Sequence, residues 1–233
     1  MTWWAKPEAF PFWDIDSTES FSNADEIYNQ LRNTWTLTAI CGMLGNMHSE
    51  SGMNPWCWQN NRVSSSGGYG LVQFTPARTY MSNGTKRVGY IDGEGEGMEG
   101  YGSSYEGYAP NMSVTETTVG ANVRDGQAQI SAVDANAGGK YSSHNRHCDY
   151  ADITSVNSFS DYKQCNDLWI ATVGWLIYYE APREKGYNVA KARFANAEKF
   201  WKHFTEDPPI PPTPPPPTPT SHKMPLWMYL RRV

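Results

Sequence analysis

One stretch, residues 36–55, restricts the fold of this chain more than any other. Its apolar residues recur every three or four positions, which predicts an amphipathic helix. These residues, with one histidine, are Leu37, Ile40, Cys41, Leu44, Met47 and His48. Thr36 precedes the pattern and can accept a hydrogen bond from the first turn as an N-cap. Gly52 and Pro55 follow it, and both residue types end helices, so we expect the helix to finish near Gly52.

Glu50 lies in the last turn of this predicted helix or just after it. The negative end of the helix dipole disfavours a carboxylate there, and Trp56 and Trp58 follow closely enough to exclude water. Both effects raise the pKa of a carboxyl group, which suits a general acid at neutral pH. The simpler alternative is a solvated glutamate at a frayed helix end, because most glutamates are exposed.

A second, glycine-rich motif follows, with Gly-Tyr-Gly-Leu-Val-Gln-Phe-Thr over residues 68–75. Together with Glu-Ser-Gly-Met-Asn-Pro over residues 50–55, it resembles the lysozyme superfamily, which includes goose-type lysozymes and lytic transglycosylases. Residues 39–51, Trp-Gln-Asn at 58–60 and Tyr-Glu-Ala-Pro at 179–182 are similar to one branch, the lysozyme domain of tail-tip morphogenesis proteins of short-tailed phages. The resemblance covers residues 22–204.

This resemblance implies a mainly helical α+β fold of the lysozyme type, with a small β element lining the cleft. It implies a glycoside hydrolase that cleaves the MurNAc–GlcNAc β-1,4 bond of peptidoglycan, with Glu50 as general acid. The substrate-binding residues that it implies are Tyr69, Gly70, Gln73, Thr75, Trp58 and Gln59. The Gln73 amide can donate and accept hydrogen bonds, as a sugar N-acetyl group requires, although it could instead brace the turn.

The second catalytic group stays open at this point. The candidate carboxylates are Glu180, Asp92, Glu94 and Asp125. Glu180 matches a family position but is more simply explained as a brace at a helix end. If one carboxyl acts alone, the chain is a lytic transglycosylase, in which a hydroxyl of the sugar closes an anhydro ring. A non-catalytic wall-binding or tail-structural module is another alternative, against which the retention of Glu50 argues.

Composition divides the chain into several segments. Residues 1–21 are aromatic and contain prolines, which predicts an irregular arm, and residues 22–206 form the catalytic domain. Within that domain, residues 81–122 are rich in Gly, Glu and Tyr and are expected to form an insertion or flap. Residues 207–220 are a proline-rich linker of polyproline II type, and residues 221–233 form a short docking peptide.

Further helices are expected inside the catalytic domain. One opens with a capping box at residues 22–25, and others cover residues 123–137, 158–163, 168–179 and 189–204. The helix over 168–179 is apolar on nearly all sides, which places it in the core. The apolar face of the last helix is predicted as Ala190, Phe194, Ala197, Trp201 and Phe204, with Lys191, Arg193, Glu198 and Lys202 elsewhere. Residues 70–75 alternate between faces and predict a strand.

The cysteines allow several interpretations. Cys41 lies on the core face of the first motif helix and is expected to be a small buried hydrophobe. Cys148 and Cys165 could form a disulfide in an oxidising environment. A cysteine peptidase using Cys57 with a histidine, His144 or His147, lacks any supporting sequence context.

Two weak metal patterns are also present. His144, His147 and Cys148 match no zinc module, and the acidic run that begins at Asp92 has Ser103 where a calcium loop requires glutamate. We therefore expect no metal and no cofactor.

Charge and hydropathy restrict the partners. The net charge of −5 argues against a nucleic-acid-binding protein, which needs a basic surface. No apolar run is long enough to span a membrane, and residues 1–7 do not resemble a signal peptide. The resemblance implies peptidoglycan glycan strands as substrate and other phage tail proteins as partners of the N-terminal arm or the C-terminal peptide. It implies a location at the phage tail tip or, for an endolysin, release to the cell wall.

Overall fold

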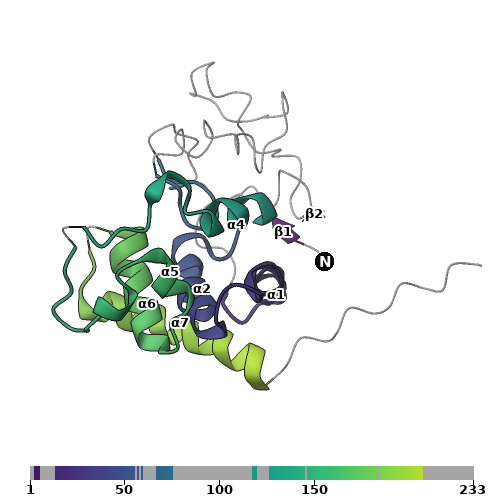
Figure 1. Cartoon of the computed structure of the whole chain (residues 1–233). Helices are drawn as coiled ribbons and strands as arrows, with labels where there is room; N and C mark the ends of the chain where they lie inside the picture. The colour runs from purple at the N-terminus through teal and green to yellow at the C-terminus, as the bar shows by residue number, and fades with distance from the viewer. Residues whose placement is uncertain are drawn as a thin grey trace, which may run out of the picture.

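The structure is a computed structural model that describes residues 3–5, 14–55, 57, 59, 67–75, 117–119, 126–144, 146–182 and 184–206. This part of the chain is mainly helical (Figure 1). The α-helices are α1 (Thr18–Leu31), α2 (Leu37–Ser51), α4 (Gly126–Asp134), α5 (Phe159–Lys163), α6 (Leu168–Trp175) and α7 (Tyr187–Glu206). The 3-10 turns η4 (Ala137–Gly139) and η5 (Thr154–Val156) and the π-helix η6 (Leu176–Glu180) complete the helical elements. Strand β1 (Trp3–Ala5) pairs antiparallel with β2 (Thr117–Val119).

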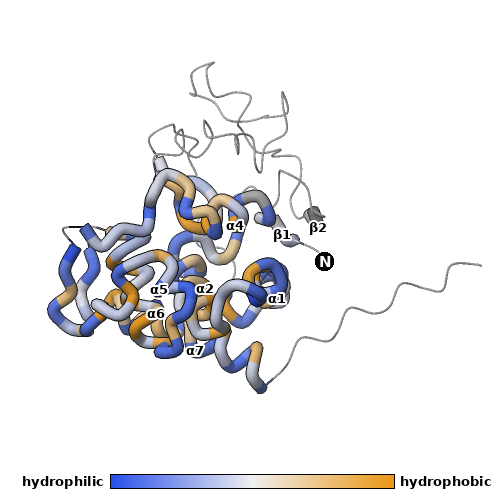
Figure 2. Tube along the Cα trace, viewed as in Figure 1, coloured by the Kyte–Doolittle hydropathy of each residue, from blue (hydrophilic) through white to orange (hydrophobic). Residues whose placement is uncertain are grey.

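Helix α2 is the central element, as Figure 1 shows. Its predicted ends are confirmed: the Thr36 side chain accepts a hydrogen bond from the Ala39 amide, and Gly52 ends the helix in the left-handed conformation with φ 58°. Every residue from 38 to 47 is buried, because α6, α7 and α1 pack around the helix. Figure 2 shows hydrophobic colour concentrated in this interior.

Two glycines let α2 approach its neighbours closely. A Cβ atom on Gly42 would lie 2.7 Å from the Ala171 Cβ of α6, and one on Gly45 would lie 2.5 Å from the Arg193 carbonyl oxygen of α7. Since real Cβ atoms do not approach other heavy atoms so closely, only glycine permits these helix spacings. The contact at Gly45 fixes α7 beside the last two turns of α2.

The helix over residues 168–179 was correctly predicted to lie in the core, and it has a feature that the sequence did not indicate. Asp167 caps α6 by accepting from the Ile170 amide, and the chain then widens into the π-helix η6. Ala181 ends η6 with φ 45°, an uncommon conformation for a residue other than glycine. Helical distortions of this kind occur mostly at functional sites.

Several local predictions were wrong. Helix α1 begins at Thr18 with Ser17 as its N-cap, not at Ser22, and residues 3–5 form β1, so residues 1–21 are not wholly irregular. Residues 70–73 form a turn, not a strand, because Gly70 and Gln73 both have positive φ. The small β element expected at the cleft is therefore a turn within the described residues.

The remaining helical predictions are confirmed with shifted ends. The predicted helix over residues 123–137 is α4, whose described part begins at Gly126, and the one over 158–163 is α5, capped by Ser158. Among the described residues, no helix has the length and apolar character needed to cross a membrane.

A buried glutamine joins two parts of the chain near the site. Gln129 of α4 accepts from the Leu71 amide at 2.8 Å and donates to the Pro55 carbonyl at 2.6 Å. It therefore ties the turn over residues 70–73 to the segment that follows α2. A side chain on Gly70 would displace this glutamine, since a Cβ there would lie 2.2 Å from the Gln129 Oε1.

The cysteines all carry free thiols in the structure, so the Cys148–Cys165 disulfide is not formed. Cys41 is fully buried as predicted, and burial raises the pKa of its thiol far above the usual range. In the described ranges, no three His, Cys, Asp or Glu side chains gather as metal ligands. The calcium-like run beginning at Asp92 lies outside the described residues.

Candidate active site

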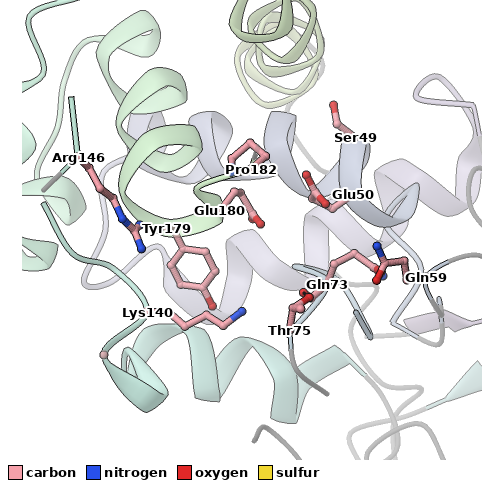
Figure 3. Close-up of a pocket in the computed structure, with 11 residues that line it drawn as sticks. Ser49, Glu50, Gln59, Gln73, Thr75, Lys140, Arg146, Tyr179, Glu180 and Pro182 are labelled. Carbon is pink, nitrogen blue, oxygen red and sulfur yellow. Dashed lines mark hydrogen bonds between the residues drawn. The ribbon is translucent and has the colours of Figure 1, made fainter. Parts of the chain in front are cut away.

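A cleft of about 790 Å³ opens where α2, η6 and the glycine-rich turn meet. Its lining residues are Ser49, Glu50, Gln59, Gln73, Thr75, Gly139, Lys140, Arg146, Tyr179, Glu180 and Pro182. In Figure 3 the two glutamates extend into the same opening, Glu50 from the last turn of α2 and Glu180 from the end of η6. Lys140, Thr75 and Gln73 follow the facing edge. The cleft thus presents two carboxyl groups opposite polar side chains.

Glu50 makes an ion pair with Arg193 of α7. The Arg193 Nη2 lies 2.5 Å from the Glu50 Oε1, and the two side chains are 9% and 21% exposed. The Arg193 Nη1 donates to the backbone and side-chain oxygens of Asn46, both at 3.3 Å. A charge-assisted hydrogen bond of this length fixes the orientation of the Glu50 carboxyl group.

Glu180 has the opposite electrostatic environment. Its Oε1 accepts a 2.9 Å hydrogen bond from the Trp175 indole, one turn earlier. Burial and, next in size, the charge of Glu50 raise the pKa of Glu180 to about 8. Arg193, Lys140 and the indole lower this pKa but do not offset the burial. At neutral pH, Glu180 is therefore mostly protonated beside an ion-paired Glu50, the arrangement expected when two carboxyls share a site.

Lys140 supplies a cation to the facing edge of the cleft. Its ammonium lies over the rings of Phe74 and Tyr179, at 5.6 and 5.8 Å from the ring centroids. Burial lowers the pKa of Lys140, while the charges of Glu180 and Glu50 act against this effect. Lys140 thus offsets part of the negative charge that the two glutamates bring into the cleft.

The glycine-rich motif forms the wall beside Glu50. Gln73 has φ 45°, and its Nε2 donates to the Gly70 carbonyl at 3.0 Å and to the Cys57 carbonyl at 3.2 Å. Gln59 joins this wall because its Oε1 accepts from the Gly68 amide at 2.9 Å. The Gln73 amide nitrogen therefore braces the turn, the alternative role that the sequence had left open. A strained non-glycine residue that also lines a cleft is typical of a functional site.

The structure gathers only part of the predicted site. Glu50, Gln59, Gln73, Thr75 and Glu180 line one cleft. Tyr69 and Gly70 are buried and are not among its lining residues. Trp58, Asp92, Glu94 and Asp125 lie outside the described residues.

Three cationic residues at or beside the cleft, Lys140, Arg146 and Arg193, were missed. Arg193 had been placed on the polar side of its helix, but the buried positions of α7 are Ala190, Arg193, Ala197, Phe200 and Phe204. The available signal for a buried Arg193 was its spacing, three residues after one buried alanine and four before the next. A charged residue on an apolar helix face needs a partner of opposite charge. Nothing in the local sequence indicated Lys140 or Arg146.

Replacing Gln73 with alanine tests the bracing role. We expect a lower melting temperature, because the Gly70 and Cys57 carbonyls each lose one of their two donors, and a loss of cleavage smaller than that from a change at Glu50. Thermal unfolding and peptidoglycan-clearing rates measure the two effects. A variant with unchanged melting temperature but no activity would instead make Gln73 a direct substrate contact.

The raised pKa of Glu180 predicts a pH-dependent stability difference. The pKa of Glu180 is about 8 in the folded chain against an ordinary value of 4.5, so between these values the folded state binds more protons than the unfolded state. The Glu180 contribution to the free energy of unfolding therefore falls as pH rises through this window. Glu180→Gln cannot ionise, so its melting temperature relative to the wild type should increase from pH 5 to pH 8.5. The exposed Glu184→Gln is the control, and a pH-independent difference for Glu180→Gln would contradict the prediction.

Two comparisons with known proteins bear on the family of this chain. The model of one family, described as phage tail lysozyme, matches residues 22–204. Part of the chain is 52% identical over 79 residues to "Morphogenesis protein 1" of Bacillus phage B103, a match covering 31% of this chain and 22% of that protein. Because the family model matches well over half of the chain, the chain belongs to the phage tail lysozyme family.

Proposed function

We propose that this chain cleaves the MurNAc–GlcNAc β-1,4 bond of peptidoglycan, with Glu50 as the general acid. Membership of the phage tail lysozyme family supports a peptidoglycan-degrading role in the phage tail. The observation that carries the finer proposal is the placement of Glu50 and Glu180 in one cleft, opposite polar side chains. Glycoside cleavage in most enzymes uses two such carboxyl groups.

The charges of the two glutamates suggest how the proton is supplied. Glu180 holds a proton at neutral pH next to Glu50, so the pair retains one proton between them. The proton passes from Glu180 to Glu50, and Glu50 transfers it to the glycosidic oxygen as the bond from that oxygen to the sugar C1 breaks. The bonding electrons stay with the oxygen, and Arg193 stabilises the Glu50 carboxylate that is left. Water then adds to C1 and returns a proton to the two carboxyl groups. We therefore assign to Glu180 the role of holding the proton that Glu50 donates.

A transglycosylase reaction on the same bond is the second candidate, and the state of Glu180 favours it. If Glu180 keeps its proton throughout the reaction, it adds no negative charge beside a cationic sugar intermediate, and Glu50 alone acts first as acid and then as base, as in a transglycosylase. Mass analysis of fragments released from purified peptidoglycan distinguishes the two. Reducing MurNAc ends indicate hydrolysis, anhydro-muramic ends indicate a transglycosylase, and an absence of fragments would mean a non-catalytic wall-binding module.

The C-terminal segments are proposed to act outside catalysis. Helix α7 ends at Glu206, and the proline-rich residues 207–220 and the docking peptide 221–233 follow. Truncation after Glu206 should leave a folded domain with the cleavage rate of the full chain, because every described cleft residue precedes this point. Fragment release by the two proteins on one peptidoglycan preparation measures this. A folded but inactive truncated domain would place part of the site after residue 206.

The partners of the chain follow from the same assignment. The glycan strands of peptidoglycan are its substrate, and other tail proteins are proposed to hold it at the tail tip. The relative from Bacillus phage B103 is called a morphogenesis protein, and this name fits a protein that is assembled into the phage particle.

A further inference from the structure

We propose that Arg193 is a positioning residue of the catalytic site: it holds the Glu50 carboxyl in place and stabilises the negative charge that Glu50 acquires as its proton leaves. This inference rests on the proposed role of Glu50 as the acid. It adds a residue that the sequence predicted to lie on the outer face of its helix.

The position of Arg193 is fixed from two sides. Its backbone lies against Gly45, where a Cβ atom would be only 2.5 Å from the Arg193 carbonyl oxygen, so α7 cannot move away from α2 without losing this contact. Its Nη1 donates to both oxygens of Asn46. Asn46 is itself held by hydrogen bonds to the Gly42 carbonyl at 2.8 Å and to the Thr172 carbonyl at 3.1 Å.

The free end of the guanidinium is therefore directed at Glu50. The Nη2 lies 2.5 Å from the Glu50 Oε1, and the arginine is 8% exposed, so water screens the interaction weakly. A fixed cation that meets a carboxylate as it forms needs no rearrangement during the reaction, which is the feature of electrostatic preorganisation.

A purely structural role explains this arginine less well. Burying an ion pair costs desolvation energy that the attraction often does not repay, and an apolar pair of similar size is usually at least as stable. The Arg193 Nε also has no hydrogen-bond partner among the described residues, which adds to the cost. Burying the Arg193 charge beside Glu50 lowers the stability of the fold, so a role of Arg193 in the reaction explains its position better than a role in stabilising the fold.

The surrounding charges determine how specific the test must be. The charge of Glu50 raises the pKa of Glu180. Lys140, in the segment after η4, interacts with the charges of both glutamates, and the charge of Arg146 lowers the pKa of Lys140. Arg193 acts on Glu180 as well as on Glu50. The effect of an Arg193 variant must therefore be compared with that of another cation on the same helix.

The test compares Arg193→Met, Arg193→Lys and Lys199→Met on soluble, uncross-linked peptidoglycan strands. Lys199 is the matched control, because it also lies on α7 and pairs with an aspartate, Asp16, but its side chain is 45% exposed. We expect kcat of Arg193→Met to fall by about tenfold to a hundredfold with KM nearly unchanged. Arg193→Lys should recover only part of this loss, since a single ammonium cannot reach Asn46 and Glu50 with two separate arms.

The outcomes separate this inference from the proposed function. If Glu50→Gln is inactive while folded Arg193→Met keeps the wild-type kcat, Arg193 does not act on Glu50 and the inference is wrong. If Arg193→Met does not fold, the kcat of Arg193→Lys decides, and a wild-type value overturns the inference. If Glu50→Gln itself cleaves normally, the assignment of the acid fails first.

Discussion

Replacing Glu50 with glutamine should lower the rate of peptidoglycan cleavage by roughly a hundredfold or more, the usual loss when a general acid is removed. Glutamine has the same shape as glutamate but has no proton of suitable acidity to give to the leaving oxygen. Release of soluble fragments from purified peptidoglycan measures the rate. Glu198→Gln on the exposed side of α7 is the control and should cleave like the wild type.

The structure shows that Glu50→Gln also lowers the free energy of unfolding, an effect that the sequence alone did not indicate. Glu50 is the counter-ion of a buried arginine, Arg193, so Glu50→Gln leaves that cation without its charge partner. Loss of a buried partner costs about 1–3 kcal/mol of the free energy of unfolding, although the glutamine oxygen can still accept a hydrogen bond. Rates should therefore be measured well below the melting temperature, with circular dichroism as the check of folding. A folded Glu50→Gln protein with normal activity would remove Glu50 from the mechanism.

The main helix of the site could be predicted because its signals are local. Thr36 and Gly52 act on the residues next to them, and the apolar spacing between them describes one helix face, so both ends of α2 were correctly placed. The same holds for α6, whose apolar sequence requires a core position. Glu50 was singled out by the resemblance of residues 50–55 and 68–75 to the lysozyme superfamily, together with its place at the end of this helix, and it does line the cleft.

The rest of the site depends on contacts between distant segments, which periodicity does not show. The ion pair of Arg193 with Glu50 joins residues 143 positions apart, and only the packing of α7 on α2 reveals it. The strand predicted over residues 70–75 failed for a related reason. Alternation of apolar residues also fits a turn with buried side chains, and here the Leu71 amide donates to the Gln129 side chain of α4.

The packing of α7 on α2 leads to the second large effect: Gly45→Ala should destabilise the fold. The added Cβ would lie 2.5 Å from the Arg193 carbonyl oxygen and 2.7 Å from the Ala197 amide nitrogen. Both are backbone atoms of a long helix, so they cannot move aside as a flexible side chain would. Alanine favours a helix over glycine by about 1 kcal/mol, whereas overpacking of this kind costs about 1–3 kcal/mol or more.

We expect the clash to dominate, with a net loss of about 2 kcal/mol, or roughly 4–8 °C in melting temperature for a domain of this size. Gly186→Ala is the matched control, because no heavy atom lies within 4 Å of a Cβ built there. Cleavage by the folded fraction of Gly45→Ala should also fall, since moving α7 outward draws Arg193 away from Glu50. A Gly45→Ala protein as stable as Gly186→Ala would mean that the two helices do not meet at this glycine, and the proposed positioning of Glu50 by Arg193 would then lose its support from the packing.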